Sequence, residues 1–410
     1  MKKYVIIGNG TAAVGVIEGI RSVDPSGAVT VISEEDHHVY SRPLISYYLE
    51  GRTDLQRMKY RDDDFYEKNR CKVLFGRCAE SLDPDAKTVC LGDGTIISYD
   101  RLAVAAGSRP FVPPVEGLDT VKSKFTFMTL DDALGLEKTL TADAKVLIVG
   151  AGLIGLKCAE GIRGKAGSIT VCDLADRVLS SILDGGCASV VQKHLESNGI
   201  SFILSDTAVR FDGNKAFMKS GRTVSFDVLV MAVGVRANTE LVKNAGGEVN
   251  RGIIVSSRME TSLPDVYAAG DCTEGFDSSA GVRRVLAILP NAYMQGRTAG
   301  VNMAGQKAEM NNAIPMNSVG FFGLHIMTAG SYEGDMAEEK NDGTVKRFFT
   351  KDGYLKGFIL IGGTERAGIL TSLIRDKIPL DTVDLHLAEK VISNMIFKED
   401  LRRKKFGGVV

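Results

Sequence analysis

Two copies of a glycine-rich turn, each following an apolar run, constrain the fold of this chain more than any other feature. The first copy is residues 8–13 (GNGTAA), after the apolar run 4–7, and the second is residues 150–155 (GAGLIG), after 146–149. In each copy the first glycine permits a tight turn, the second lets the backbone approach a pyrophosphate, and the third small residue lets a helix pack on a strand. The pattern predicts two Rossmann-like units, each with a helix N-terminus aimed at a phosphate.

An acidic residue follows each unit where a second strand is expected to end. The predicted strand 29–33 ends at Glu34, with Glu35 next, and the corresponding acid of the second unit is Asp173. A carboxylate there accepts hydrogen bonds from ribose hydroxyls and repels a 2′-phosphate. Because the first arginine after Asp173 is Arg177, we expect NAD(H) rather than NADP(H) in the second unit. The alternative, a Rossmann turn without a ligand, is less favoured for two paired copies than for one.

Composition sets broad limits on the class of protein. The chain has 410 residues, of which 44% are hydrophobic and 25% charged, as is ordinary for a globular protein of several domains. Its net charge of −1 gives no overall attraction to nucleic acid or membrane. No apolar run approaches the ~20 residues that span a bilayer. The N-terminus superficially resembles a signal peptide, but cleavage would destroy the first glycine turn, so we expect a cytoplasmic protein.

The cysteines form no recognisable metal or redox motif. There is no C-x-x-C pair and no Cys/His cluster with the spacing of a zinc or iron–sulfur site. We therefore predict no metal site and interpret the cysteines as reduced thiols. The seven are Cys71, Cys78, Cys90, Cys158, Cys172, Cys187 and Cys272.

The order of the expected elements indicates an α/β fold with two Rossmann-like dinucleotide-binding domains and a C-terminal α+β domain. The first domain is predicted to be discontinuous, over residues 1–113 and 245–309. The second is expected over 114–244 and the third over 310–410. Prolines mark the crossing between the first two domains: Pro110, Pro113 and Pro114.

Several shorter elements can be predicted as well. The charged stretch 52–68 is expected to be helical, and residues 72–75 and 87–91 alternate like short antiparallel strands, the second of them before a Gly-Asp-Gly turn. Pro290 suits the first position of a helix. In the third domain we expect strands at 346–349 and 355–361 and helices at 367–375 and 387–395.

These motifs together resemble the flavoprotein superfamily of pyridine nucleotide–disulfide oxidoreductases. The resemblance is carried by the two glycine turns, by residues 105–110 (AAGSRP) and by 268–272 (AAGDC). Residues 39–46 (VYSRPLIS) are similar to a segment of rubredoxin, ferredoxin and nitrite reductase flavoproteins. Residues 289–300 (LPNAYMQGRTAG) are similar to the NAD/FAD subunits that accompany bacterial iron–sulfur and carbon monoxide dehydrogenase systems. The resemblance implies FAD and NAD as cofactors.

The resemblance also implies roles toward the nucleotide part of FAD. Gly8, Gly10 and Glu34 would hold the pyrophosphate and the ribose. Asp271 would hydrogen-bond the ribityl chain, and Ala79 would lie near the adenine.

Further residues would surround the flavin ring. Arg42 and Pro43 would lie against the isoalloxazine. The helix that begins at Pro290 would point its positive end at the N1/C2 carbonyl edge, where it would stabilise an anionic reduced flavin. Phe321 or Phe322 would come from the third domain.

The NADH site implied by the resemblance uses Gly150, Gly152, Gly155 and Asp173, with Gly234 near the path of the nucleotide. The other candidates for cofactor binding flank these motifs: Thr11, Ala12, Ala13, Glu35, Ala106, Gly107, Arg109, Leu153, Ile154, Gly270, Asn291 and Ala292.

Two departures from the family pattern matter for the chemistry. Disulfide reductases carry a reactive cysteine in the segment occupied here by residues 41–46, which contains none. Since disulfide exchange requires a thiolate, that activity is not expected. Relatives also pair a lysine of this segment with a glutamate of the NAD-domain helix, where this chain has Tyr47 and Lys157. We expect Lys157 near flavin N5, with Tyr47 as its neighbour; the alternative is a lysine on a solvated helix face.

These observations predict an FAD-dependent NADH oxidoreductase that moves electrons between NAD(H) and a one-electron iron–sulfur partner, such as ferredoxin, rubredoxin or a cluster-bearing subunit. The sequence does not indicate whether electrons flow from NADH to the partner or from the partner to NAD. The alternatives are an NADH oxidase that uses oxygen and a non-catalytic NADH-sensing flavoprotein subunit. The cationic run 402–405 is either a docking site for an acidic partner or a solvated tail. A homodimer or a complex subunit is compatible with the sequence.

Overall fold

The first glycine turn joins a strand at the centre of a parallel sheet to the helix that covers it. The computed structural model describes residues 1–341 and 343–406. In the first sheet, of order β19-β7-β1-β2-β3, the central strand β1 pairs in parallel with both β2 and β7. Its elements are β1 (Lys3–Ile7), α1 (Thr11–Arg21), β2 (Ala28–Ile32), β3 (Cys71–Leu74), β7 (Arg101–Val104) and β19 (Val266–Ala268).

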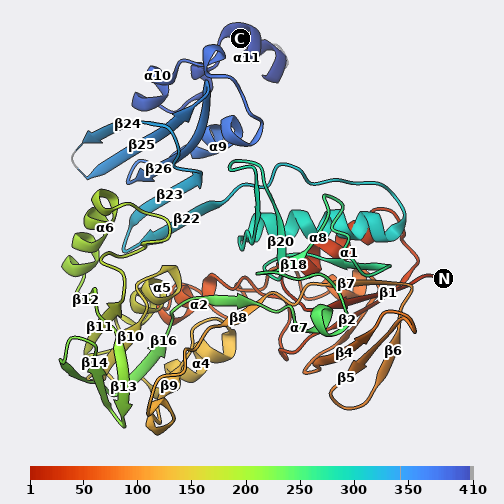
Figure 1. Cartoon of the computed structure of the whole chain (residues 1–410), viewed down its shortest axis with the longest axis horizontal. Coiled ribbons are helices and arrows are strands. Elements are labelled where there is room, and N and C mark those ends of the chain that lie inside the picture. The colour runs from red at the N-terminus through yellow and green to blue at the C-terminus, as the bar shows by residue number, and fades with distance from the viewer. Residues whose placement is uncertain (342, 407–410) are drawn as a thin grey trace.

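Helix α8 (Leu289–Ala304) packs directly on α1, and the two lie side by side in Figure 1. Small residues permit this close approach. A Cβ at Gly296 would lie 2.0 Å from Ala12 O, and one at Gly300 would lie 2.2 Å from Val16 O. Pro290 lies in the first turn of α8, as its second residue rather than the predicted first. The packing brings the N-terminus of α8 to the side of the first sheet that carries the glycine turn.

The second glycine turn occupies the equivalent place in a second parallel sheet, of order β12-β11-β10-β16-β9. It connects β10 to α5, and β10 pairs in parallel with β11 and β16. The buried runs of β10 and β16 explain why both strands read as continuous apolar segments. The elements are β9 (Lys124–Phe125), α4 (Leu130–Thr139), β10 (Lys145–Val149), α5 (Leu153–Ile162), β11 (Ser168–Asp173), α6 (Gly185–Ser197), β12 (Ile200–Leu204) and β16 (Val228–Met231).

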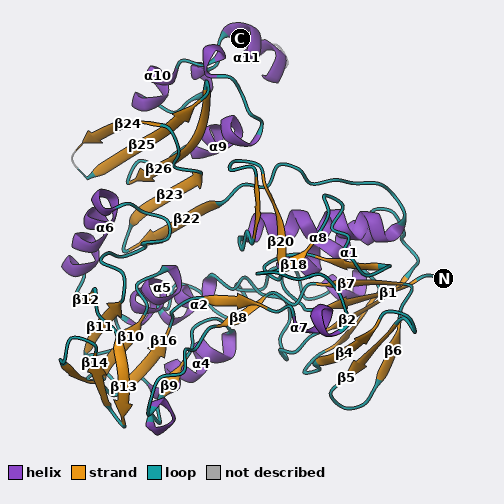
Figure 2. Ribbon diagram, in the orientation of Figure 1, coloured by secondary structure: helices purple, strands orange, loops and turns teal. Residues whose placement is uncertain are grey.

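Short antiparallel sheets and helices attach to these two units (Figure 2). A ribbon of β8 and β17 links them, and the hairpin of β20 and β21 precedes α8. The remaining bounds are α2 (Leu44–Leu49), α3 (Phe65–Lys68), β4 (Ala79–Asp83), β5 (Thr88–Leu91), β6 (Ile96–Ser98), β8 (Ser108–Pro110), β13 (Ala208–Asp212), β14 (Lys215–Met218), β15 (Thr223–Ser225), β17 (Val235–Ala237), α7 (Glu240–Asn244), β18 (Ile253–Ile254), β20 (Thr273–Asp277) and β21 (Val282–Arg284).

The C-terminal part is an antiparallel sheet, of order β22-β23-β26-β25-β24, with helices on one face (Figure 1). Alternate residues of β26 serve two cores: Phe358 and Leu360 pack with helix α9, whereas Ile359 and Ile361 pack with the second Rossmann unit. The sheet therefore forms a layer between them. Its elements are β22 (Met316–Phe321), β23 (Leu324–Gly330), β24 (Asp335–Asn341), β25 (Thr344–Lys351), β26 (Tyr354–Ile361), α9 (Ala367–Arg375), α10 (Leu385–Lys390) and α11 (Glu399–Phe406).

Three expectations about local structure were wrong. Of the stretch 52–68, only α3 is helical. Its aspartates favour turns, as when Asp54 accepts the Arg57 N–H at 2.9 Å. Strand β3 pairs in parallel with β2, not antiparallel. The predicted helix 387–395 is divided into α10 and a short 3₁₀ turn, because Ser393 is extended and caps the turn.

Other expectations are confirmed. Helix α9 has the predicted bounds, and the predicted strands 346–349 and 355–361 lie within β25 and β26. After the second unit, β19 joins the first sheet, α8 packs on α1, and Ile253 of β18 lies in the same core, as a discontinuous first domain requires. The domain boundaries themselves stay predictions. Within the described residues, no helix combines the length and apolar character needed to cross a membrane.

Candidate functional site

The first glycine turn forms an open cradle at the N-terminus of α1. Gly8 has φ +107°, and a Cβ there would lie 2.1 Å from Ala105 O, so only glycine fits. Gly10 is the N-cap of α1, and a Cβ on it would meet nothing within 4 Å. The first hydrogen bond of α1 runs from Val14 N to Gly10 O, which leaves the preceding N–H groups directed at that open space. The space fits a pyrophosphate.

The second glycine turn repeats this geometry. Gly150 has φ +119°, and a Cβ on it would lie 2.2 Å from Ala232 O. Gly152 caps α5 and faces open space, as Gly10 does. A Cβ at Gly155 would lie 2.0 Å from Gly150 O, so the third glycine is required for the turn to close. Both turns thus suit a dinucleotide phosphate, and Leu153 and Ile154 lie half-buried in the first turn of α5.

The acids behind the two turns differ in their surroundings. Glu34 is exposed beyond the end of β2, where a ribose could reach it. Asp173 instead accepts backbone N–H groups at both oxygens, from Ala151 at 2.6 Å and from Ala175 at 2.8 Å. Asp173 therefore also holds the second glycine turn in place, a role that the sequence did not indicate.

Glu35 supports Arg42. Its carboxylate forms an ion pair with the Arg42 guanidinium and accepts a hydrogen bond from Tyr40 Oη at 2.6 Å. Arg42 also donates to Met128 O at 3.1 Å, so this residue connects the segment before α2 to the segment before α4. Sequence reasoning grouped Glu35 with the ribose ligands, whereas the structure engages its carboxylate on Arg42 and Tyr40.

Asp271 lies close enough to Arg42 for their charges to interact. Burial raises the pKa of Asp271, and Arg42 lowers it by a smaller amount. Burial also opposes the charge on Arg42, but Tyr40 and Glu35 more than offset this effect, and the pKa of Arg42 rises. Gly270, before Asp271, has φ +85° and donates its N–H to Gln295 of α8 at 2.8 Å, so the AAGDC segment is fixed to that helix.

The predicted catalytic pair is brought together between α2 and α5. Lys157 Nζ lies 4.4 Å from the centroid of the Tyr47 ring, and 5.7 Å from that of Phe321. The Lys157 side chain is only 16% exposed and forms an ion pair with Glu160, which is 3% exposed. The alternative of a lysine on a solvated helix face is therefore wrong. Sequence reasoning gave Glu160 no role in the site, although its i, i+3 spacing from Lys157 was the signal that could have revealed the pair.

The turn between β22 and β23 brings the C-terminal sheet to this pair. Phe321 is fully buried, and Phe322 has φ +47° before Gly323 at φ +88°. The Phe322 N–H donates to Glu160 Oε1 at 2.6 Å, and His194 Nε2 lies 2.9 Å from Phe321 O. Phe321 thus reaches the Lys157–Tyr47 cluster as a core residue.

The other predicted residues lie partly in or beside helices α1, α2 and α8, and partly in or beside the β8–β17 ribbon and in the β4-β5-β6 sheet. Gly107 and Gly234 have positive φ, and Ala106 O accepts a hydrogen bond from Asn238. Arg109 forms a bidentate ion pair with Glu240, with contacts of 2.5 and 2.9 Å. The remainder are placed as follows: Pro290 exposed, Asn291 and Ala292 buried in α8, Thr11, Ala12 and Ala13 buried in α1, Pro43 exposed before α2, and Ala79 half-buried at the start of β4.

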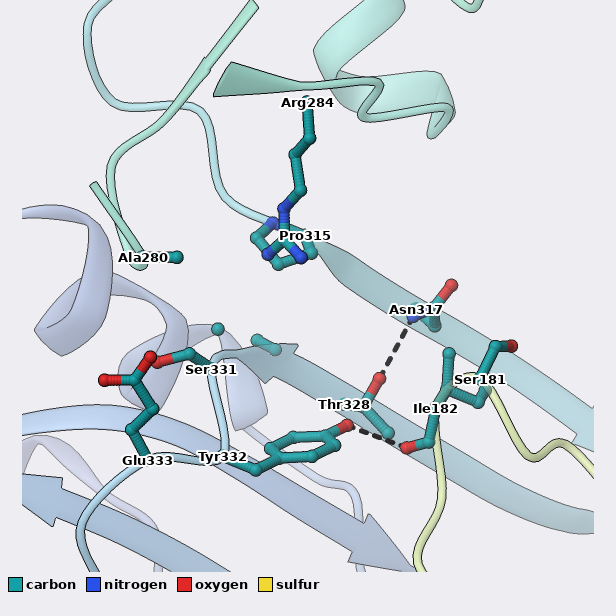
Figure 3. A pocket seen from close by; sticks show the side chains of 12 residues that line it. Ser181, Ile182, Ala280, Arg284, Pro315, Asn317, Thr328, Ser331, Tyr332 and Glu333 are labelled. Atoms are coloured by element: carbon teal, nitrogen blue, oxygen red, sulfur yellow. Dashed lines mark hydrogen bonds between the residues drawn. The ribbon is translucent and has the colours of Figure 1, made fainter. Parts of the chain in front are cut away.

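A cavity that the sequence did not predict lies where the C-terminal sheet meets both Rossmann units. Its volume is about 350 Å³, and Figure 3 shows Arg284 of the β20–β21 hairpin pointing toward Pro315. Tyr332 Oη donates to Ile182 O at 2.8 Å across one wall. None of the predicted site residues lines it. The lining is Ser181, Ile182, Ala280, Arg284, Pro315, Asn317, Thr328, Ala329, Gly330, Ser331, Tyr332 and Glu333.

None of the thiols whose pKa is shifted is activated. Burial raises the pKa of Cys71 to about 11, and of Cys172, Cys187 and Cys272 to about 12. Cys272 is fully buried, and its Sγ contacts Ala269 O at 3.3 Å within the AAGDC segment. All seven cysteines are free. A thiol with a raised pKa supplies little thiolate at neutral pH, so this geometry does not suit thiol–disulfide exchange.

A family model described as pyridine nucleotide-disulphide oxidoreductase matches residues 2–296, which include both glycine turns. The chain belongs to this family. Membership confirms the predicted resemblance, the two-unit α/β fold and the class of enzyme, an oxidoreductase that uses FAD and NAD(H).

Characterised relatives extend over nearly the whole chain. The epsilon subunit of NADH-dependent phenylglyoxylate dehydrogenase from Aromatoleum evansii is 31% identical, with 91% of each chain covered. An NADH oxidase from Methanocaldococcus jannaschii is 30% identical, with 88% of each covered. A rubredoxin-NAD(+) reductase from Acinetobacter baylyi is 27% identical over 92% of this chain and 99% of the relative.

The fold is also that of a solved reductase. Putidaredoxin reductase, in its covalent complex with putidaredoxin, superposes with a TM-score of 0.87 at 23% identity, over 98% of this chain and 97% of that one. The likeness includes the C-terminal sheet, which lies beyond the residues that the family model matches.

Proposed function

We propose that the protein transfers electrons between NAD(H) and a one-electron iron–sulfur protein or cluster-bearing subunit. The observation that carries this proposal is the absence of a reactive cysteine from the segment where disulfide reductases of the family carry one. Residues 41–46 contain no cysteine, and burial raises the pKa of the AAGDC thiol, Cys272. Electrons that arrive as hydride then have no disulfide to reduce within this chain. An external carrier is the simplest destination, as the names of the rubredoxin and putidaredoxin reductases indicate for those proteins.

Binding of the two dinucleotides is assigned to the two turns. The free N–H groups at the start of α1 would bind the FAD pyrophosphate, and those at the start of α5 the NAD(H) pyrophosphate. Glu34 would hold the FAD ribose, and Asp173 the NAD(H) ribose while it orders the turn. Bound FAD would supply the capacity to accept hydride from NADH and to release electrons singly.

The remaining roles concern orientation and charge. Arg42, fixed by Glu35 and by Met128 O, would place its guanidinium against the ring. The N-terminus of α8, opened by Pro290, would direct its positive end at the negative edge of the ring. Lys157 and Tyr47 would line the face between the two turns, and Phe321 would close it from the C-terminal sheet.

The test is an anaerobic titration of the purified yellow protein with NADH, followed by oxidised ferredoxin or rubredoxin. We expect stoichiometric bleaching by NADH and rapid reoxidation by one of the carriers. Rapid oxygen uptake with no reaction toward carriers would favour the oxidase alternative, for which the relative from M. jannaschii is the precedent by name. Bound FAD without turnover toward any dye would favour a sensing subunit.

The identity of the electron partner and the oligomeric assembly of the protein are also proposals. The epsilon subunit among the relatives suggests that this chain also works within a larger complex. The cationic run lies on α11, where Arg403 pairs with Glu399 at 2.6 Å, and the side chains of Lys404 and Lys405 lie outside the described residues. Removal of residues 402–410 should lower the salt dependence of carrier reduction if this run docks an acidic partner. The compartment, predicted to be the cytoplasm, also stays a prediction.

A further inference from the structure

Lys157 is held by a counter-ion on its own helix. Glu160 lies one turn further along α5, and the pair is shielded from solvent, with side-chain exposures of 16% and 3%. A buried cation without a partner is costly, and a buried pair requires further hydrogen bonds to satisfy its remaining donors and acceptors. The structure provides these: Lys157 Nζ donates to Gly320 O at 3.2 Å, and Glu160 Oε1 accepts the Phe322 N–H at 2.6 Å.

The pair is therefore fixed to the C-terminal sheet as well as to α5. The two contacts go to the end of β22 and to the turn that follows it, and His194 of α6 supplies a third, to Phe321 O at 2.9 Å. The backbone of this turn has nowhere to move without breaking one of them. Lys157 is consequently held over the Tyr47 ring by contacts that a surface lysine lacks.

Close packing of α2 on α5 places this pair where the helix that begins at the second glycine turn meets α2. A Cβ at Gly161 would lie 2.8 Å from Ser46 O, so α5 runs directly against the segment that follows Arg42 and Pro43. A charge that stands beside the flavin changes its reduction potential, because the reduced flavin is the more negative form and a nearby cation stabilises it.

We infer that Glu160 is a positioning residue that holds Lys157 and partly offsets its positive charge, so that the buried pair sets the reduction potential of the bound FAD. This inference rests on the proposed function, since it requires FAD at the first turn. Lys157 raises the potential, Glu160 lowers it, and the wild-type value reflects their balance.

The experiment measures the two-electron midpoint potential of the FAD in Lys157→Met, in Glu160→Gln and in the double variant. Glutamine retains an oxygen for the Phe322 N–H, so Glu160→Gln removes charge and leaves the turn contact. We expect Lys157→Met to lower the potential and Glu160→Gln to raise it, each by about tenfold in the ratio of reduced to oxidised flavin, or about 30 mV for two electrons. The double variant should return toward the wild-type value.

The chain offers two matched controls. Lys165 and Glu137 form a second lysine–glutamate pair that also contacts a tyrosine of α2, Tyr48, but both are about one-third exposed and lie at the far end of α5. Glu137→Gln should leave the potential unchanged. His194→Ala removes the third contact to the turn but no charge of the buried pair, so it should lower thermal stability and shift the potential less than either charge variant does.

Several results would overturn the inference. If Lys157→Met and Glu160→Gln shift the potential in the same direction, Glu160 only supports the fold. If neither shifts it while FAD is bound and NADH still bleaches it, the pair is not electrostatically coupled to the flavin, and the proposed function stands. Protein that binds no FAD overturns the proposed function and this inference together. Should Glu160→Gln fail to fold, Glu160→Asp tests the same point, because its shorter carboxylate compensates Lys157 less and should raise the potential by a smaller amount.

Discussion

The two glycine turns share one backbone conformation but differ in their third small residue and in the surroundings of the acid that follows them. In the first, the third small residue is Ala13, and the acid at the end of the next strand, Glu34, is exposed. In the second, the third residue is Gly155, where a Cβ would lie only 2.0 Å from Gly150 O. The acid of this unit, Asp173, accepts a hydrogen bond from the Ala151 N–H of the turn. The second turn is therefore the more tightly determined of the two, which suits a site that must be complete before a visiting nucleotide arrives.

The largest effect is expected from exchanging the third residue of each turn. Gly155→Ala forces the second turn open, because its Cβ would meet the Gly150 carbonyl. We expect the rate of flavin reduction by NADH to fall about 100-fold, as a displacement of roughly 1 Å suffices for this. Stopped-flow bleaching measures it. Ala13→Gly should cost only about 1 kcal/mol of stability and leave the FAD content unchanged. Equal losses in both variants would mean that the turns do not differ in tightness.

The next largest effect, on nucleotide affinity, is expected from removing the acids Asp173 and Glu34. Asp173→Ala removes two hydrogen bonds from a charged acceptor to the backbone, at about 1.5–3 kcal/mol each. NADH affinity should therefore fall about 100-fold or more in a titration. Glu34→Ala removes an exposed carboxylate that orders nothing in the protein itself, so FAD affinity should fall about tenfold or less. A larger loss from Glu34→Ala than from Asp173→Ala would reverse the comparison.

The backbone plan of both turns could be predicted from sequence because it depends on local rules. Glycines at fixed spacing, flanked by apolar runs, specify strand, turn and helix without reference to the rest of the chain. The strands next to the two turns, at 4–7, 29–33 and 146–149, and helix α9 were accordingly predicted well. The parallel pairing of β3 was missed, because a short alternating run does not reveal which neighbour it will find.

Tertiary contacts account for the residues whose roles were missed. Glu160 gains its importance from a turn more than 150 residues later in the chain, and Glu35 from Arg42 and Tyr40, which approach it only in the folded state. Asp173 was identified as a ribose ligand, but its bond to Ala151 depends on the parallel register of β10 and β11. Sequence motifs name the ligand-binding groups more readily than the groups that hold them in place.

A smaller effect, on thermal stability, is expected at Asp271. This carboxylate belongs to the segment that returns to the first unit after the second, and among the described residues the second unit has no counterpart of it. Burial raises its pKa, so the folded protein binds this proton more tightly than the unfolded chain does. The associated stability is complete below the unfolded pKa of about 3.9 and is lost as pH rises through the folded value. Asp271→Asn should therefore raise the melting temperature of the apoprotein at pH 7, by roughly 1 °C for each kcal/mol in a chain of 410 residues. The difference should disappear toward pH 4; a difference that is constant with pH would contradict this assignment.

The smallest effect is expected in the ribbon that links the two units, where Arg109 of β8 meets Glu240 next to β17. The Arg109 hydrogen bond lowers the pKa of Glu240 to about 2. A lowered pKa contributes stability above the unfolded value of about 4.3 and loses it as pH falls toward 2. Both side chains are about half exposed, so solvent screening reduces the gain to about 0.5 kcal/mol. Glu240→Gln should lower the free energy of unfolding by that amount at pH 7 and low salt, and by less at high salt. FAD content and NADH affinity should stay unchanged, because the pair joins the units without contributing to either turn; a loss of NADH affinity would show that the ribbon helps to set the second turn.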